Sequence, residues 1–347
     1  MRSRGRKIYH LCFVSLVGWS SISANELGLN GGIYSNFGNS YDFYDFSENL
    51  LDLNFFYNDL QGWIQYEYSN PPDIGFMKND IRKFRLEYSA EDFYVKLGDI
   101  YEFWGRGLVL NQFDDQVTSY DNGTRGIYFE YNKGPLSFSH LNGNSDIWLL
   151  GGGTRIPELN NIHNMSANRL HYDFNLISLG FTQLRSNENH SLTSGPPVDI
   201  NHDIKGTYLS WAGGFADLFM EYADKSSTQK ISSFGGAPND TLKRGYGYYQ
   251  NINFYFGNWG LSTEYKRYAF DKLQGDITAN TFGNQIEYQQ MPTLAKEHNS
   301  TLLGRVSHTY SFNDERGIQM ELNGSFMDLA ISFQYAHLSR NQEWKTN

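Results

Sequence analysis

The sequence contains almost no cysteine: Cys12 is the only one in 347 residues. It lies in an N-terminal stretch that we expect to be removed, which leaves the mature chain without a thiol. Such a chain forms no disulfide, no zinc–thiolate site and no iron–sulfur cluster, and it has no cysteine nucleophile. No other spacing in the sequence indicates a metal or a cofactor, so we predict neither.

Long apolar runs are also missing. No stretch beyond the N-terminus approaches the roughly 18 residues that a membrane-spanning helix needs. The N-terminus itself has basic residues within its first seven positions, an apolar stretch over 8–19 and small residues up to Ala24. That order is typical of a secretory signal peptide. We expect residues 1–24 to be a removed signal peptide and residues 25–347 to form the mature protein.

Basic residues are in deficit, with 28 Lys and Arg against 38 Asp and Glu and a formal charge of −10. Removing residues 1–24 takes away four basic residues and no acidic one, so the mature balance is 24 against 38 and the charge −14. A chain this acidic is a poor partner for nucleic acid. We therefore predict no nucleic-acid function.

Proline is scarce, and its eight positions mark the gaps between segments of a regular pattern. Within each segment, apolar and polar side chains alternate. In residues 60–69, for example, Leu60, Ile64 and Tyr66 share one parity, while Gln65 and Glu67 share the other. A strand sends successive side chains to opposite faces, so each segment predicts a ribbon that is apolar on one face and polar on the other.

About ten residues of tilted strand cross the apolar part of an outer membrane. The connections between segments alternate between tight turns and longer stretches rich in Asn, Asp, Ser and Gly, as expected when the turns face the periplasm. The predicted strands are 28–36, 46–57, 60–69, 80–89, 92–101, 124–133, 135–142, 167–175, 176–185, 204–212, 215–223, 246–257, 259–269, 281–290, 300–311, 316–324 and 326–338.

This pattern predicts an all-β fold, an antiparallel up-and-down transmembrane β-barrel of about 16–18 or more strands. A soluble secreted β-sandwich is the alternative. By parity, the last predicted strand ends on the outer side, and no closing strand with a periplasmic aromatic end follows. We therefore expect residues 25–347 to be an N-terminal part of a larger barrel, unless a strand near 291–311 is miscounted. The expected location is the outer membrane, with the lipid bilayer as partner; the pattern does not predict the oligomeric state.

One segment, 97–126, breaks the alternation. Gly98, Gly105 and Gly107 surround Trp104 and Arg106, which favours close backbone approach or bulges. The segment either folds inward and narrows the lumen or forms an exposed loop. Charged residues here and on the neighbouring strands are the candidates for lining a lumen or its constriction: Glu67, Lys83, Arg85, Glu87, Lys96, Asp99, Glu102, Arg106, Asp114, Asp115, Arg125 and Glu130.

The same segment resembles a motif of an uncharacterised outer-membrane barrel family of the Bacteroidota type. The matching residues are Gly98, Asp99, Tyr101, Glu102, Gly105, Gly107, Leu108, Asp121, Asn122 and Gly126. Trp104 stands where the motif has phenylalanine. The resemblance implies an outer-membrane β-barrel and no known activity. A weaker similarity to the alginate-export barrels lacks their excess of lumen arginines.

Three functions are consistent with these features. The first is a pore or transporter for a small polar solute or an exported polymer, because charged lumen residues can set selectivity. The second is a non-conducting structural or interaction barrel whose long loops bind partners. An outer-membrane hydrolase is the least favoured, because the histidines are scattered and no G-x-S-x-G sequence accompanies them. We predict no catalytic residue and no enzyme activity.

Overall fold

The computed structural model describes residues 27–40, 44–116, 120–150, 156–190, 198–230, 241–269, 288–289 and 315–339. This part of the chain contains strands and turns and no helix, and hence no helix that could span a membrane. The predicted signal peptide, Cys12 and the last eight residues lie outside the described residues.

Fifteen strands form one antiparallel sheet in which every strand pairs with its neighbours in chain order. The strands are β1 (Gly28–Ser40), β2 (Tyr44–Tyr57), β3 (Leu60–Ser69), β4 (Lys78–Ser89), β5 (Phe93–Ile100), β10 (Thr124–Lys133), β11 (Leu136–Leu150), β12 (Pro157–Asp173), β13 (Ile177–His190), β14 (Val198–Ala212), β15 (Ala216–Lys230), β16 (Thr241–Phe256), β17 (Trp259–Ala269), β18 (Glu315–Phe326) and β19 (Leu329–Ser339). The predicted all-β, up-and-down fold is confirmed.

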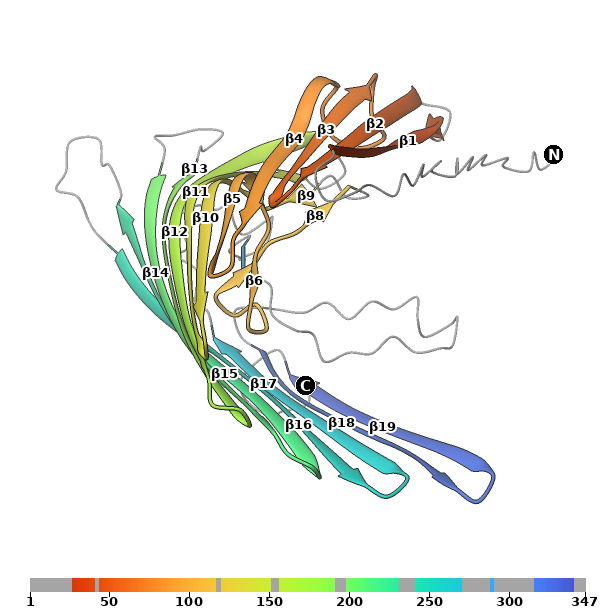
Figure 1. Ribbon diagram of the computed structural model, residues 1–347, viewed down its shortest axis with the longest axis vertical. Coiled ribbons are helices and arrows are strands. Elements are labelled where there is room, and N and C mark those ends of the chain that lie inside the picture. Colours follow the sequence, from red (N-terminus) through yellow and green to blue (C-terminus); the bar gives the residue numbers. More distant parts are fainter. Residues whose placement is uncertain are drawn as a thin grey trace.

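The sheet is strongly curved, and β1–β4 stand opposite β16–β19 across its hollow side (Figure 1). β1 and β19 are its two edges, and the described residues contain no pairing between them. Two short hairpins lie between β5 and β10: β6 (Phe103–Trp104) with β7 (Leu110–Asn111), and β8 (Asp114–Asp115) with β9 (Tyr120–Asp121).

The tight turns occur where the sequence predicts them, all at one end of the sheet. Asn58, Asn175 and Gly257 adopt positive φ at three of them, a conformation that these residue types tolerate best. Fifteen of the predicted strands are present. The other two, 281–290 and 300–311, lie outside the described residues except for Tyr288 and Gln289, which belong to no strand.

Several strands are longer than the sequence predicts. The stretches 143–166, 186–203 and 224–245 were expected to be loops, yet most of their described residues continue β11 to β16. Most of their outward positions are polar, with Trp148, Ile162 and Leu242 as apolar exceptions, and this interrupts the apolar alternation that would have marked them as strands. The outward apolar series therefore covers only the turn-proximal halves of these strands.

The apolar core lies on the inner face of the sheet, beside buried polar side chains of the same face. Leu141, Ala167, Leu184 and Ile204 are fully buried on β11 to β14. What covers them is the connection between β5 and β10. The inner face of this region is consequently packed, where the sequence predicts a polar lumen surface.

Candidate functional site

Residues 101–116 and 120–123, which we call the inward segment, lie between β5 and β10 and pack across the hollow side of the sheet (Figure 1). Of the two alternatives raised by the sequence, the inward fold is the one observed. Trp104, Leu108, Val109 and Leu110 are at most 1% exposed. Such burial of four large apolar side chains stabilises the segment by several kcal/mol, at about 1.5–3 kcal/mol for each.

The tip of the inward segment docks on a single carboxylate. Glu221 of β15 is buried and accepts hydrogen bonds from the backbone N–H groups of Arg106, at 2.5 Å, and Leu108. Gly105 and Gly107 adopt φ of +61° and +87° at this turn. A Cβ on Gly105 would lie 2.6 Å from both carboxylate oxygens, so only glycine fits there.

The tip is also held from the opposite side. The backbone N–H of Asn111 donates to the carbonyl of Tyr288 at 2.8 Å, and the Gln289 side chain donates to the carbonyl of Leu108. The Tyr288 hydroxyl hydrogen-bonds Ser186 of β13 at 2.7 Å. The segment is thus fixed between the sheet and a second stretch of chain more than 170 residues away in sequence.

The return end of the inward segment is held by charge. Asp114 forms a bidentate pair with Arg82 at 2.9 and 3.0 Å and contacts Lys83 Nζ at 2.5 Å. Lys83 Nζ also lies 3.0 Å from Asp121, which accepts a hydrogen bond from the Tyr101 hydroxyl at 3.1 Å. Paired and partly buried charges of this kind hold one geometry better than exposed pairs do.

A β-bulge explains how two successive cations reach this cluster. The pairing of β3 with β4 shifts between Gln65 and Tyr66, whose partners are Lys83 and Ile81. Arg82 is the extra residue, so it turns inward beside Lys83, where strict alternation would place it outward. Its guanidinium also donates to Gln65 at 2.7 Å and lies 3.4 Å from Glu67.

Burial alone would raise the pKa of Asp114, but the hydrogen bonds and charges of Arg82 and Lys83 outweigh it. The net effect lowers the pKa of Asp114 below its ordinary value of 3.8. Burial, together with the nearby carboxylates, raises the pKa of Tyr101 well above 10. Asp114 is therefore ionised and Tyr101 is a neutral donor at physiological pH.

The wall opens where β5 and β10 end. β4 pairs with β5 only over 85–89, so residues 78–84 have no strand partner on that side, a stretch we call the wall gap. Asp99 accepts the backbone N–H of Phe84 at 2.7 Å, and Arg125 donates to the carbonyl of Arg82. Asp99 and Arg125 also pair with each other at 2.9 Å. These two side chains substitute for part of the missing ladder.

A pocket of about 550 Å³ occupies the wall gap, between β4, the return end of the inward segment and β11. Above it, the rings of Phe76 and Trp148 meet edge to face at 4.9 Å. Its lining carries six carboxylates against three cationic groups, namely Glu48, Glu67, Asp80, Asp99, Asp121 and Asp146 against Lys78, Arg82 and Arg125. The volume suits a small ligand, and the charge balance favours cationic or neutral polar ones.

Except for Arg125, which also lines this pocket, the remaining predicted residues lie apart from it. Arg85 pairs with Glu87, Lys96 with Glu102 at 2.7 Å, and Glu130 with Arg169 at 3.2 Å. Arg106 lies at the exposed tip over the rings of Phe219 and Tyr249, and Asp115 lies in β8. Arg125 shares the outward parity of Ile127, and its guanidinium lies over Phe84. That these residues line a conducting lumen stays a prediction.

Four residues of these networks were absent from the sequence-based set: Arg82, Asp121, Arg169 and Glu221. Arg82 faces inward only because of the β-bulge, and no residue pattern in the sequence predicts that bulge. Asp121 was noted in the family motif without a role. Glu221 and Arg169 have the inward parity of their strands, but their partners lie 115 and 39 residues away.

A buried polar chain lies on the inner face of β13 to β15. His202 contacts Glu188 at 2.9 Å through Nε2 and Ser227 at 2.8 Å through Nδ1. Ser227 is 1% exposed, so its hydroxyl is packed within the wall. The described residues contain no group of three or more His, Cys, Asp or Glu placed to hold a metal ion.

Solved structures with a related fold are outer-membrane proteins. The copper transporter OprC aligns with 90% of this chain and 53% of its own, at 11% identity and a TM-score of 0.50. OpdK of Pseudomonas aeruginosa, solved with vanillate, aligns over 90% and 81% at 12% identity and a TM-score of 0.44. OmpT of Vibrio cholerae aligns over 80% and 95% at 14% identity and a TM-score of 0.39. At such identities the likeness concerns the fold, that of an outer-membrane β-barrel.

The sequence matches none of the curated proteins. A family model does match, over residues 40–332. These residues include the inward segment, the wall gap and thirteen of the fifteen sheet strands, from β2 to β18, together with the last residue of β1 and the start of β19. Because the match covers most of the chain, the protein belongs to the family of unknown function DUF6029.

Proposed function

We propose that the protein resides in an outer membrane and forms the wall of a pore for small polar solutes, with the inward segment narrowing the passage. The observation that carries this proposal is the inward fold of residues 101–116 and 120–123, from β5 to Glu221 on β15. A segment fixed at both ends can set the width of a lumen, and the charged groups beside it can set selectivity.

The pocket in the wall gap gives the proposal its chemical direction. An excess of carboxylates in its lining favours cationic or neutral polar solutes over anions. No catalytic step is part of the proposal, since the buried Ser227–His202–Glu188 chain is explained as polar packing of the inner face.

A non-conducting barrel is the second candidate, and one observation favours it. The inner face of β11 to β14 is covered by an apolar core together with Trp104 and Leu108. A dry interface of this kind closes part of the lumen instead of lining a water-filled passage. The two candidates differ in whether a passage remains beside the inward segment.

Conductance of the purified protein in planar bilayers separates them. Gly105→Val places atoms on the Glu221 carboxylate and should release the tip, so the single-channel conductance should rise above that of the wild type. Gly214→Val is the matched control, because a Cβ there meets nothing within 4 Å. Heat-modifiable gel mobility verifies the fold of each sample. Silence of folded wild type and folded Gly105→Val would remove the pore and leave the non-conducting barrel.

Selectivity is tested in the same bilayers. Asp146→Asn removes a carboxylate from the pocket lining and should lower the preference for cations, measured as a shift of the reversal potential towards zero in a salt gradient. Asp328→Asn, in the turn between β18 and β19, is the control and should leave the reversal potential unchanged.

A further inference from the structure

The outer face of β11 to β15 changes from apolar to polar at a sharp boundary that runs across all five strands. The paired outward residues form rows, because cross-strand neighbours lie side by side. The last largely apolar row is Phe138, Leu170, Phe181 and Tyr222, with Thr207 on β14 as its one hydroxyl residue besides the tyrosine. The next row, about 6.6 Å further from the turns, is His140, Asn168, Gln183, Lys205 and Asp224.

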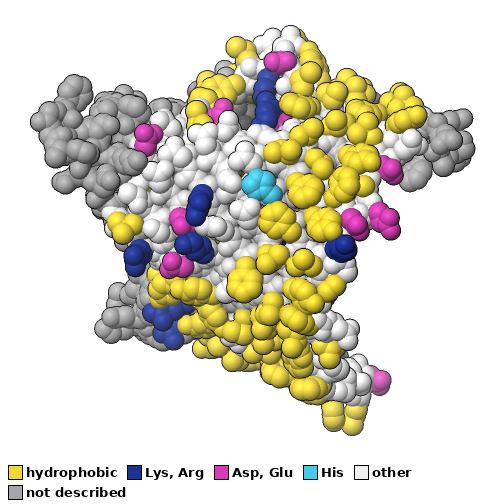
Figure 2. Space-filling model, turned by 60° about the vertical axis from the view of Figure 1, so that its left-hand side comes forward, with side chains coloured by type: hydrophobic (Ala, Val, Ile, Leu, Met, Phe, Trp, Pro, Cys, Tyr) yellow, Lys and Arg dark blue, Asp and Glu magenta, His cyan; other side chains and the backbone are white. Residues whose placement is uncertain are grey.

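Two more polar rows follow, and we call the ten residues of these two rows the outer polar field. The first contains Asn142, Ser166, Arg185, Asp203 and Ser226, and the second contains Asn144, Asn164, Asn187, Asn201 and Thr228. Figure 2 shows a largely polar area on this face, bordered by hydrophobic side chains below it and to one side.

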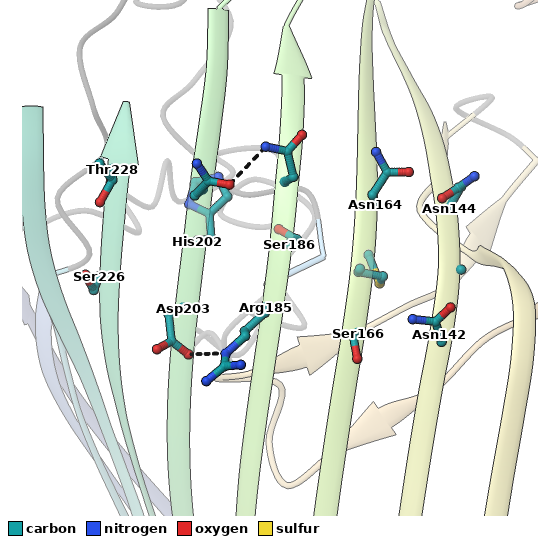
Figure 3. Close-up of a pocket in the computed structure, with 14 residues that line it drawn as sticks. Asn142, Asn144, Asn164, Ser166, Arg185, Ser186, His202, Asp203, Ser226 and Thr228 are labelled. Atoms are coloured by element: carbon teal, nitrogen blue, oxygen red, sulfur yellow. Dashed lines mark hydrogen bonds and ion pairs between the residues drawn. The ribbon is translucent and has the colours of Figure 1, made fainter. Parts of the chain in front are cut away.

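These ten residues line an open pocket of about 590 Å³, and their side chains project from five adjacent strands (Figure 3). The two charges of the pocket contact each other, Arg185 Nε and Asp203 lying 3.7 Å apart. Eight neutral amides and hydroxyls remain, so the surface offers paired donors and acceptors without net charge. Asn187 donates to Asn201 at 2.9 Å, while the exposed amides of Asn142, Asn144 and Asn164 form no side-chain hydrogen bond with the described residues.

Amides and hydroxyls in such an array match the hydroxyl groups of a saccharide, each of which donates and accepts. The border of the field adds aromatic rings: Tyr222 and Tyr246 stack at 6.4 Å between centroids. A lipid chain, in contrast, would leave the exposed amides of Asn142, Asn144 and Asn164 without a hydrogen-bond partner. The field therefore excludes acyl chains and suits sugar.

The wall gap gives an independent reason to place this height of the wall outside the hydrocarbon. Residues 78–84 lack a strand partner on one side, and the side chains that cap Phe84 and Arg82 there are the charged groups of Asp99 and Arg125. Lipid disfavours both an open ladder and such charges. Asn144 lines both the pocket in the wall gap and the pocket of the outer polar field, so the two pockets adjoin.

We infer that the outer polar field binds the saccharide portion of a glycolipid in the outer leaflet, whose acyl chains lie against the apolar rows below. This inference rests on the membrane location in the proposed function, but not on conduction. The occupant has its sugars at the height of Asn144, Asn164 and Asn187 and its chains at the height of Phe181 and Leu170.

The test uses the full chain, purified in detergent, and lipopolysaccharide isolated from the expressing cells. Native mass spectrometry counts the lipopolysaccharide molecules bound to the protein, and titration with lipopolysaccharide measures the affinity. The triple variant Asn144→Leu, Asn164→Leu, Asn187→Leu should bind at least about tenfold more weakly, because several hydrogen bonds are lost. Asn30→Leu, Asn36→Leu, Asn54→Leu, on the inner face of β1 and β2, is the matched control and should bind like the wild type.

The delipidated core oligosaccharide should compete with lipopolysaccharide, and phosphatidylethanolamine should not. Unchanged lipopolysaccharide binding by a folded Asn144/Asn164/Asn187 variant would overturn the inference. The inference would also be overturned if the oligosaccharide failed to compete, or if phosphatidylethanolamine bound equally well. It would be overturned as well if the triple variant lost self-association of the protein but kept its lipid binding. Silence in planar bilayers with saccharide-dependent binding intact would remove the pore and leave this inference standing.

Discussion

The outer wall over β1–β4 and the outer wall over β11–β15 share one fold but differ in how far their apolar surface extends. On β1–β4, four successive outward rows are apolar or glycine, and the fourth consists of Ile33, Leu51, Tyr66 and Ile81. On β11–β15 three rows are apolar, and the fourth contains Gln183 and Lys205. The strands are longer where the apolar surface is shorter.

The difference teaches that strand length and membrane thickness are separate quantities in this protein. Three rows at about 6.6 Å each, on tilted strands, fall short of an apolar band about 25 Å tall, whereas four rows come closer to it. The additional length of β11 to β15 thus stands beyond the hydrocarbon.

The largest effect is expected from a charge in the last apolar row of β13. Phe181→Lys should destabilise the inserted barrel by about 2–4 kcal/mol, because its outward side chain faces lipid. Gln183→Lys, one row further from the turns, should change stability by less than about 0.5 kcal/mol. Urea unfolding in lipid vesicles measures both. An equal loss of unfolding free energy in the two variants would show that the lipid does not end between these two rows.

The second prediction concerns the junction of the two walls. Asp99→Asn removes the charge that accepts the Phe84 N–H and pairs with Arg125, so we expect a loss of about 1–3 kcal/mol. The readout is the midpoint of thermal unfolding in detergent, with Asp328→Asn as the control. If the midpoint of Asp99→Asn equals that of the wild type, the Asp99 carboxylate does not stabilise the unpaired edge of β4 in the wall gap.

The fourth row sharpens the comparison further. Tyr66→Lys on β3 should cost about 1 kcal/mol, the penalty expected near the membrane interface. The residue of the same rank on β13 is Gln183, where Lys should cost nothing measurable. Urea unfolding in vesicles again compares them, and a neutral Tyr66→Lys variant would show that the two walls end at the same height.

The smallest effect is a pH dependence confined to the return end of the inward segment. The pKa of Asp114 is lower in the folded chain than in the unfolded one, so its stabilisation is present above the unfolded value of about 4. It is lost as the pH falls through the folded value. Pepsin cleavage within residues 101–123 should therefore increase only below about pH 4. Asp114→Asn should be cleaved more readily and lack this pH step, and an unchanged pH profile in that variant would contradict the assignment.

Most of the fold could be predicted from the sequence because lipid imposes a period of two on it. Where outward residues are mostly apolar, as over 60–69, 124–133 and 259–269, the predicted bounds equal the observed ones. Where the wall leaves the lipid, outward Asn and Ser remove that signal, and β12 was expected to begin ten residues too late. Polar residues on both faces look like a loop to any argument based on alternation.

Less of the site could be predicted, because it depends on contacts between distant parts of the chain. The glycines of the inward segment indicated close backbone approach, and Gly105 against Glu221 is such a contact. No local pattern, however, selects Glu221 among the acidic residues with inward parity. The bulge that turns Arg82 inward is likewise a property of the pairing of two strands and not of either alone.

The position of Glu221 orders the events of folding. Its partner Arg106 precedes it by 115 residues, so the tip of the inward segment has no docking point until β15 has joined the sheet. Closing so long a loop carries an entropic cost that contacts repay only at the end. The apolar Trp104–Leu110 hairpin is therefore exposed during synthesis and insertion until β15 has formed. We expect periplasmic chaperones to bind the chain at this hairpin until the later strands have joined the sheet.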